Sequence, residues 1–364
     1  MTLNLAIVGG DGTGPEVVAE GLKVLDVLAK DMDFTVNAKQ FPFGAKHYLE
    51  TGNVLTDSDI EELKNYDAIY LGAVGHPDVK PGILEKGLLL KMRFDLDQYI
   101  NLRPVKLYDG VDTPLAGKTT KDIDFVCVRE NTEDLYCGNG GLTRKGTLNE
   151  ISTQEMIATR FGAERCVRYA FELARSRKAA GYPGRLTLVH KTNVLTYCGD
   201  TWFRAFNEVG ESEFPEIERD YHHVDACCMY MVTRPELYDV VVVPNMFGDI
   251  ITDLGAAIAG GMGIASSGNL NPDKGNNNPS MFEPIHGSSP DIAGQNKANP
   301  LAAIDSLAVL LQETGRKKDD DVLIKAGERV AKAVQSITHK FTGKRLDRSG
   351  FSTTEIGQMV LDAL

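Results

Sequence analysis

The chain has 364 residues, and its 39 Lys and Arg residues against 51 Asp and Glu residues give a formal charge of −12. This length suits two domains or one large α/β unit, and a hydrophobic share of 42% is typical of a globular protein. The acidic excess argues against a nucleic-acid or anionic membrane surface, because both partners need basic side chains. Any anionic ligand must therefore be bound by a local basic pocket.

The cysteines and the N-terminal segment indicate a reducing compartment. The six cysteines form no Cys-x-x-Cys pair and no zinc-ligand spacing: Cys127, Cys137, Cys166, Cys198, Cys227 and Cys228. Cysteines without these patterns usually serve as small core residues of proteins in a reducing environment. Residues 1–7 lack the pattern of a leader sequence and no run of 18 apolar residues occurs, so we expect a cytoplasmic protein.

The first predicted element is a strand over 3–8, followed by a glycine-rich turn over 9–15 and a helix. Pro15 suits the first turn of that helix, where its missing N–H leaves no acceptor unpaired. The dinucleotide fingerprint G-x-G-x-x-G is not matched, because its last position is Pro15 when counted from Gly10 and Val17 when counted from Gly12. We therefore interpret this segment as a glycine-rich turn that approaches a ligand.

Strands and helices are predicted to alternate along the rest of the chain. Further strands are predicted at 34–39, 66–72, 125–129, 186–190 and 238–244, and helices at 57–65, 153–180, 201–209, 301–314, 320–339 and 353–364. This alternation predicts an α/β fold with a mixed, largely parallel sheet. No repeat or linker marks a boundary, so we expect two interleaved domains.

The strongest local signal is the segment Val240–Asp253, in which a buried strand leads through a polar turn into a helix. Asp249 and Asp253, four residues apart, then lie on one helical face just beyond the end of a strand. Two neighbouring carboxylates repel each other unless a cation lies between them, and a divalent cation prefers oxygen ligands. The alternative is that both compensate the helix dipole. Asp225 offers a third carboxylate, so we favour a metal site.

Basic residues near strand ends could form the pocket for an anionic substrate. Arg93, Arg103 and Arg129 could each bind a carboxylate through two parallel hydrogen bonds. Lys191 follows the strand over 186–190 and could act as a base if neighbouring cations lower its pKa. Taken singly, each arginine is better explained by a surface ion pair, and Lys191 by a solvated surface residue.

Five motifs in chain order carry a resemblance to a known family. They are Gly10-Asp-Gly-Thr-Gly-Pro-Glu16, Arg129-Glu-Asn-Thr-Glu133, His190-Lys-Thr-Asn193, Asn245-Met-Phe-Gly-Asp-Ile-Ile-Thr-Asp253 and Phe282-Glu-Pro-Ile-His-Gly-Ser-Ser-Pro-Asp-Ile-Ala-Gly294. Together they resemble the metal-dependent β-decarboxylating dehydrogenases of the isocitrate/isopropylmalate family. The resemblance implies a fold unlike the Rossmann fold, with a cofactor-binding domain of residues 1–99 and 260–364. A second domain, residues 100–259, would carry the metal and substrate sites and a dimerisation arm near 136–151.

The resemblance also implies roles for the candidate site residues. Mg²⁺ or Mn²⁺ would be held by Asp249 and Asp253 and by Asp225 from the partner subunit of a homodimer. The three arginines match those that bind the malate-moiety carboxylates of the substrate. Lys191, also from the partner, matches the base, and Tyr136 matches the acid that returns a proton to carbon.

The resemblance places the cofactor on a loop far from the opening glycines. The matching positions are Asn193, Glu283, His286, Gly287, Ser288, Ser289, Pro290, Asp291, Ile292 and Asn299. A carboxylate at Asp291 would accept hydrogen bonds from a ribose 2′-hydroxyl but would repel a 2′-phosphate, so we expect NAD and not NADP.

Substrate choice within the family depends on the substituent at C3. Leu88, Leu89 and Leu90 occupy the stretch where isocitrate enzymes usually carry a serine, and with Val194 they suit an isopropyl group. The alternative is that the leucine run forms the buried face of a helix and does not contact the substrate. We therefore predict the NAD-dependent oxidative decarboxylation of (2R,3S)-3-isopropylmalate to 4-methyl-2-oxopentanoate and CO₂ in leucine biosynthesis.

Two alternatives to this substrate and activity remain open. The segment Arg129–Tyr136 is similar to the isocitrate and tartrate branches, so a decarboxylating tartrate or D-malate dehydrogenase is the first alternative. A regulatory subunit that only binds a dicarboxylate is the non-enzyme alternative. It is disfavoured because Lys191, Tyr136 and the three aspartates are all present.

Overall fold

The computed structural model describes residues 2–343 and 349–364 and divides into two compact α/β units. Unit 1 consists of residues 1–98, 106–120 and 256–364, and unit 2 of residues 99–105 and 121–255. Most strand pairs in each unit are parallel, which confirms the predicted fold class. The predicted second domain, 100–259, differs from this division because residues 106–120 and 256–259 group with unit 1.

The strands of unit 1 lie in the order β2-β1-β3-β12-β11. β1 pairs in parallel with β2 and β3, β3 pairs in parallel with β12, and β11 runs antiparallel to β12. Their bounds are β1 (Thr2–Gly10), β2 (Thr35–Phe41), β3 (Ala68–Ala73), β11 (Ser266–Leu270) and β12 (Ser280–Pro284). The strands β11 and β12 were not predicted. The sequence of β11, Ser-Ser-Gly-Asn-Leu, has no apolar run although every residue is buried.

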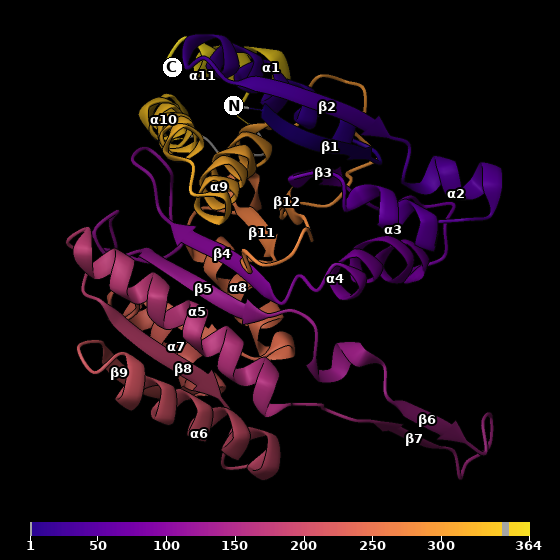
Figure 1. Ribbon diagram of the computed structural model, residues 1–364, viewed down its shortest axis with the longest axis vertical. Helices are drawn as coiled ribbons and strands as arrows, with labels where there is room; N and C mark the ends of the chain where they lie inside the picture. Colours follow the sequence, from indigo (N-terminus) through magenta and orange to yellow (C-terminus); the bar gives the residue numbers. More distant parts are fainter. Residues whose placement is uncertain (1, 344–348) are drawn as a thin grey trace. The chain divides into compact units, whose positions relative to one another are not determined.

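The helices of unit 1 cover its sheet, and α9 packs against β3, β11 and β12 while α1 and α10 pack against α9 (Figure 1). Their bounds are α1 (Gly14–Asp31), α2 (Ala45–Thr51), α3 (Asp57–Leu63), the π-helix η1 (Glu85–Leu90), α4 (Lys91–Asp95), η4 (Met262–Ile264), α9 (Leu301–Lys318), α10 (Asp321–Ile337), η5 (Thr338–Phe341) and α11 (Thr353–Leu361). Pro15 lies in the first turn of α1, and three α-helices close the chain, as predicted.

The glycine-rich turn after β1 is held by hydrogen bonds from distant segments. The Asp11 carboxylate accepts from the backbone N–H groups of Ala45 and Gly75, at 2.7 and 3.0 Å. The backbone N–H of Thr13 donates to the carbonyl of Ser288 at 2.8 Å. Gly12 has φ +57°, and a Cβ there would collide with the same Ser288 carbonyl. The turn therefore packs directly on the loop that follows β12.

The strands of unit 2 lie in the order β4-β5-β10-β8-β9. Their bounds are β4 (Ile100–Lys106), β5 (Asp124–Glu130), β8 (Arg185–His190), β9 (Glu218–His223) and β10 (Val240–Val243). β10 consists of four buried valines, which suits a parallel strand covered on both faces. Because β5, β10 and β8 are parallel neighbours, the residues that follow them meet at one edge of the sheet.

The helices of unit 2 are α5 (Arg160–Ala179), α6 (Thr196–Glu213), α7 (Val224–Thr233) and α8 (Asn245–Ile258), with short turns η2 (Asp134–Cys137) and η3 (Pro235–Leu237). α5 packs on β5, β8 and β10 beside α6. The predicted start of α5 at Thr153 is wrong, because the Thr159 side chain caps the helix by accepting from Gly162 N–H. Among the described residues, none of the helices is both long enough and apolar enough to cross a membrane.

An exposed hairpin extends from unit 2 and overlaps the region predicted as an arm, 136–151 (Figure 1). Its antiparallel strands are β6 (Gly140–Thr143) and β7 (Ile151–Gln154). Leu142, Leu148 and Ile151 on this hairpin are about half exposed or more. These apolar side chains are therefore not covered by the rest of the described chain.

We expect the substitution Gly12→Ala to destabilise unit 1 by about 2 kcal/mol or more. The new Cβ would meet the Ser288 carbonyl in a backbone conformation that disfavours L side chains. Gly52→Ala is the matched control, because Gly52 has φ +76° with nothing within 4 Å of the added Cβ, and only about 1 kcal/mol should be lost. Urea denaturation followed by circular dichroism measures both, and equal losses would show that the Ser288 contact does not matter.

Candidate active site

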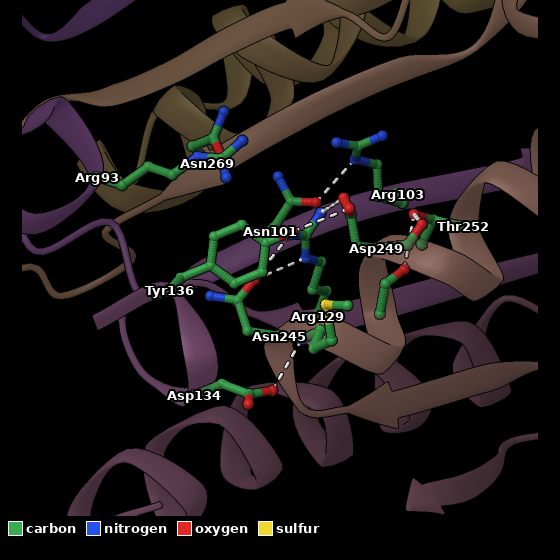
Figure 2. Close-up of polar contacts among 12 residues, drawn as sticks. Arg93, Asn101, Arg103, Arg129, Asp134, Tyr136, Asn245, Asp249, Thr252 and Asn269 are labelled. Carbon is green, nitrogen blue, oxygen red and sulfur yellow. Dashed lines mark hydrogen bonds and ion pairs between the residues drawn. The ribbon is translucent and has the colours of Figure 1, made fainter. Parts of the chain in front are cut away.

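Arg129, near the end of β5, is the buried centre of a polar cluster in unit 2 (Figure 2). Its side chain is 1% exposed. Nε and Nη2 donate to the Asn245 side-chain oxygen at 3.0 and 2.8 Å, and Nη1 donates to Asp249 Oδ1 at 2.5 Å. A Cβ on Gly248 would collide with the Arg129 side chain, so a glycine is required in α8 at this point. The cluster fixes a guanidinium beside a carboxylate.

Asp249 connects this arginine to Tyr136. The Tyr136 hydroxyl donates to Asp249 Oδ2 at 2.9 Å, and the Arg129 guanidinium lies 5.3 Å from the Tyr136 ring centre. Burial alone would raise the pKa of Asp249, but the charges of Arg129 and Arg103 and the Tyr136 hydrogen bond hold the pKa below its usual value. Asp249 is therefore a carboxylate at neutral pH.

Arg103, on β4, is also buried in unit 2. Its Nε donates to the Asn101 side-chain oxygen at 2.7 Å, and its charge acts on Asp249. Figure 2 shows Arg103 and Asn101 next to Asp249. Two of the three predicted substrate arginines therefore lie near one predicted metal ligand.

Lys191 and Asp225 form a separate pair in unit 2. The Lys191 ammonium lies 2.6 Å from Asp225 Oδ1, and the hydrogen bond and charge of Lys191 lower the pKa of Asp225. Asp225 stands in the first turn of α7, and Lys191 follows β8. The backbone N–H of Lys191 donates to Nδ1 of the buried His190 at 2.8 Å.

Two of the three predicted metal ligands lie on one helix, and the third, which was predicted to come from the partner subunit, lies on another. Asp249 and Asp253 share α8, whereas Asp225 lies on α7 and pairs with Lys191. Within residues 2–343 and 349–364, no three His, Cys, Asp or Glu side chains gather in a way that could hold a metal ion. The two α8 carboxylates are hard oxygen donors that suit Mg²⁺ or Mn²⁺, but one chain supplies an incomplete set.

In unit 1, Arg93 is buried on α4 close to Glu283 on β12. Arg93 Nη2 lies 3.6 Å from Glu283 Oε1, and the same oxygen accepts a hydrogen bond from the Asn269 side chain at 2.8 Å. A predicted substrate arginine is thus next to a predicted cofactor residue.

The leucines predicted to bind the substrate differ in exposure. Leu88 is fully buried in a core cluster with Met92 and Leu96. The prediction that Leu88 contacts the substrate is therefore corrected, and Leu88 is a core residue of unit 1. The physical reason is the helical turn of η1, which directs one leucine of the run into the core. Leu89 is only partly buried, and Val194, in unit 2, is 65% exposed.

The predicted cofactor loop follows β12 in unit 1. The Ser288 carbonyl receives hydrogen bonds from Thr13, Ile292 packs against the core beside α1, and the Asn299 side chain accepts from Leu301 N–H at the start of α9. Burial lowers the pKa of His286. Asp291 is exposed. Asn193 belongs to unit 2 and is also exposed.

Comparison with known proteins identifies the family. The family described as isocitrate/isopropylmalate dehydrogenase matches residues 4–360. The chain belongs to this family. It is 52% identical to the 3-isopropylmalate dehydrogenase of Thermobifida fusca over 357 residues, which cover 98% of this chain and 96% of that protein. It is 50% identical to the enzyme of that name from Corynebacterium glutamicum over 363 residues, 100% of this chain and 99% of the relative.

A solved structure extends the comparison to the fold. The isocitrate dehydrogenase of Methylococcus capsulatus superposes with a TM-score of 0.82 at 29% sequence identity, and each chain is covered to 99%. Both branches of the isocitrate/isopropylmalate dehydrogenase family are therefore represented among the relatives. The predicted resemblance to this family is confirmed.

Several buried polar residues near Arg129 were not among the predicted site residues of this family member. Asn245 accepts two hydrogen bonds from Arg129. The only feature of the sequence that pointed to Asn245 was its position after the buried strand β10. Glu130 is buried and accepts from the N–H groups of Thr132 and Glu133, and its burial raises its pKa to about 7. Asp134 is buried beside α8. None of these contacts has a signal in the local pattern.

We expect His190 to make this dehydrogenase less stable in acid. Burial lowers the pKa of His190 to about 4 from an ordinary 6.5, so the folded state binds fewer protons than the unfolded state between these pH values. The free energy of unfolding should therefore fall by up to about 3 kcal/mol as the pH drops through this window. In His190→Asn this part of the fall should disappear, as measured by urea denaturation at several pH values.

The exposed His339 provides the matched control, His339→Asn, which should keep the wild-type pH dependence. Equal slopes for wild type and His190→Asn would contradict the assignment.

Proposed function

We propose that the protein catalyses the oxidative decarboxylation of (2R,3S)-3-isopropylmalate to 4-methyl-2-oxopentanoate and CO₂, a step of leucine biosynthesis. The observation that carries this proposal is the contact of the buried Arg129 with Asp249, which also accepts from Tyr136, because these three side chains would combine an anion binder, a metal ligand and a proton donor. Relatives at 50–52% identity over nearly the whole chain bear the name of this activity.

The arginines would bind the two carboxylates of the malate moiety. Arg129 and Arg103 are buried in unit 2 and have fixed side-chain partners, Asn245 and Asn101, so little side-chain entropy is lost on binding. Arg93 would act from unit 1. The isopropyl group would contact Leu89 and Val194, and burial of its three carbons contributes roughly 2 kcal/mol.

The proposed metal ion is Mg²⁺ or Mn²⁺. It would be held by Asp249 and Asp253, with the third carboxylate, an Asp225, supplied by a second copy of the chain. A bound divalent cation supplies positive charge that favours ionisation of the C2 hydroxyl and stabilises the oxygen anions of the reaction. The exposed position of Asp253 and the ionised state of Asp249 support this role.

Proton transfer in the proposed reaction involves two further side chains. Lys191, as its neutral amine, would take the C2 hydroxyl proton and become an ammonium while hydride leaves C2 for the nicotinamide. Loss of CO₂ leaves an enolate, and Tyr136 would donate a proton to its carbon. A phenol with an ordinary pKa of about 10 is a weak acid at neutral pH, so a nearby ammonium would have to assist it.

We propose NAD as the cofactor, bound by the loop after β12. The loop residues would be His286, Gly287, Ser288, Ser289, Pro290, Asp291, Ile292 and Asn299, with Glu283 from β12 itself and Asn193 from unit 2. The exposed carboxylate of Asp291 supports NAD over NADP, because it would repel a 2′-phosphate.

The proposal includes a homodimer with shared active sites. Exposed apolar side chains of unit 2 support it: Leu142, Leu148, Ile151, Phe161, Tyr197, Phe203, Met229 and Val232. A partner would cover this surface and could supply its Lys191 and Asp225. A cytoplasmic location is also proposed, and the buried free thiols of Cys127, Cys166 and Cys227 support it.

We expect 3-isopropylmalate to give a kcat/KM at least about tenfold higher than D-malate, tartrate or isocitrate, because burial of the three isopropyl carbons contributes roughly 2 kcal/mol. Appearance of NADH absorbance with each substrate, Mn²⁺ and NAD measures this. A higher value for D-malate or tartrate would establish the first alternative, and no turnover of any substrate would favour a regulatory subunit. Equal use of NADP would argue against the proposed role of Asp291.

We expect Asp249→Asn to lower kcat by about 100-fold or more, because the neutral amide removes a charge that would bind the metal and leaves the Arg129 charge unpaired. Circular dichroism should still show a folded protein. Asp26→Asn, at an exposed aspartate of α1, is the control and should retain full activity. Full activity of Asp249→Asn would remove Asp249 from the proposed site.

A further inference from the structure

The turn between β5 and the arm contains a residue in an unusual backbone conformation. Asp134 has φ +71°, in the left-handed region that L side chains rarely adopt, and is 2% exposed. It begins η2, the short turn that also contains Tyr136. An aspartate tolerates this conformation better than most side chains, and local hydrogen bonds stabilise it there.

The carboxylate of Asp134 is bound at both oxygens. Oδ1 accepts from the backbone N–H of Leu135 at 2.7 Å, and Oδ2 accepts from the backbone N–H of Met246 at 2.8 Å. The backbone N–H of Asp134 itself donates to the carbonyl of Ile157 at 2.9 Å. One residue therefore connects the Tyr136 turn with two other segments: its backbone N–H binds the segment that precedes α5, and its side chain binds the first turn of α8.

The contact with Met246 matters because of what α8 carries. Met246 is the second residue of α8, and its N–H is among the first four of a helix, which have no partner within the helix. Asp249 lies about one turn further along the same helix. Next to this contact, the Asn245 side chain donates to the carbonyl of Glu133 at 3.3 Å. The turn and the start of α8 are thus joined at two adjacent points.

The Asp134 carboxylate therefore binds both segments that carry the partners of the Tyr136–Asp249 hydrogen bond. Tyr136 follows Asp134 by two residues in η2, and Asp249 follows Met246 by three residues in α8. The 2.9 Å contact between the Tyr136 hydroxyl and Asp249 Oδ2 closes the loop of contacts (Figure 2). Arg129 binds Asp249 independently, from β5.

We propose that Asp134 is a positioning residue that sets the distance and direction at which the Tyr136 hydroxyl faces Asp249. This inference rests on the proposed function, in which Tyr136 returns a proton to carbon. Asp134 touches neither substrate nor cofactor in this role. Its loss affects proton delivery by Tyr136 more than the binding of substrate carboxylates, because Arg129 and Arg103 are held by other residues.

Asp134→Gly and Asp134→Asn test the proposal. Glycine accepts the left-handed backbone but removes both side-chain hydrogen bonds, whereas asparagine keeps one acceptor oxygen and tolerates the same φ. We expect Asp134→Gly to lower kcat by about 10- to 100-fold with KM for the substrate changed less than about threefold. Asp134→Asn should recover part of the lost kcat.

A double-mutant cycle with Tyr136→Phe separates positioning from general structural damage. If Asp134 acts through the Tyr136 hydroxyl, Asp134→Gly should lower kcat less than about twofold further in the Tyr136→Phe protein. Equal losses in both backgrounds, or an unchanged kcat in the single variant, would overturn the proposal. Should Asp134→Gly fail to fold by circular dichroism, Asp134→Asn takes its place in the cycle under the same criteria.

Asp33→Gly is the matched control. Asp33 also has a positive φ, +56°, but is exposed in unit 1, so its replacement should leave kcat unchanged, and a loss equal to that of Asp134→Gly would overturn the proposal. The cycle is measured with whichever of 3-isopropylmalate, D-malate, tartrate and isocitrate gives the highest kcat/KM. A different preferred substrate would thus overturn the proposed function while leaving the test of Asp134 intact.

Discussion

The buried charge of Arg129 is the constraint on which the candidate site depends. A guanidinium withdrawn from water needs a counter-charge and hydrogen-bond acceptors, since an unpaired buried charge is strongly destabilising. Asp249 supplies the counter-charge, and Asn245 supplies an oxygen to two of the arginine nitrogens. Both acceptors belong to α8, so satisfying Arg129 also fixes the first turn of that helix. Gly248 is required because the arginine passes too close for a side chain.

The order of the elements could be predicted from the sequence because it depends on local patterns. The four valines of β10, the helical spacing in α1 and the capping residues of the C-terminal helices each signal their own element. Candidate residues at strand ends, such as Arg129 and Lys191, could be predicted because the carboxyl ends of parallel strands meet at one edge. The roles given to them still came from resemblance to the family.

Other features could not be predicted because they depend on partners that are distant in sequence. The strand β11 is polar along its length, and its burial comes from the strands and helices packed around it. Leu88 and Leu89 are adjacent and chemically identical, and only the turn of η1 decides which enters the core. Asp134 resembles any turn aspartate until Met246, 112 residues later, is brought against it. Sequence patterns describe neighbours along the chain and not these tertiary contacts.

The pairing of β3 with β12 has a consequence for synthesis of the chain. β1, β2 and β3 are made first, but their sheet gains β12 and β11 only after residues 266–284 have been translated. The contact between the first turn and Ser288 likewise joins residues 275 positions apart. Unit 2 has all of its residues by position 255, so its fold can be completed while β3 still exposes the edge on which β12 later pairs. The part of the chain that is made first is therefore the part that completes its fold last.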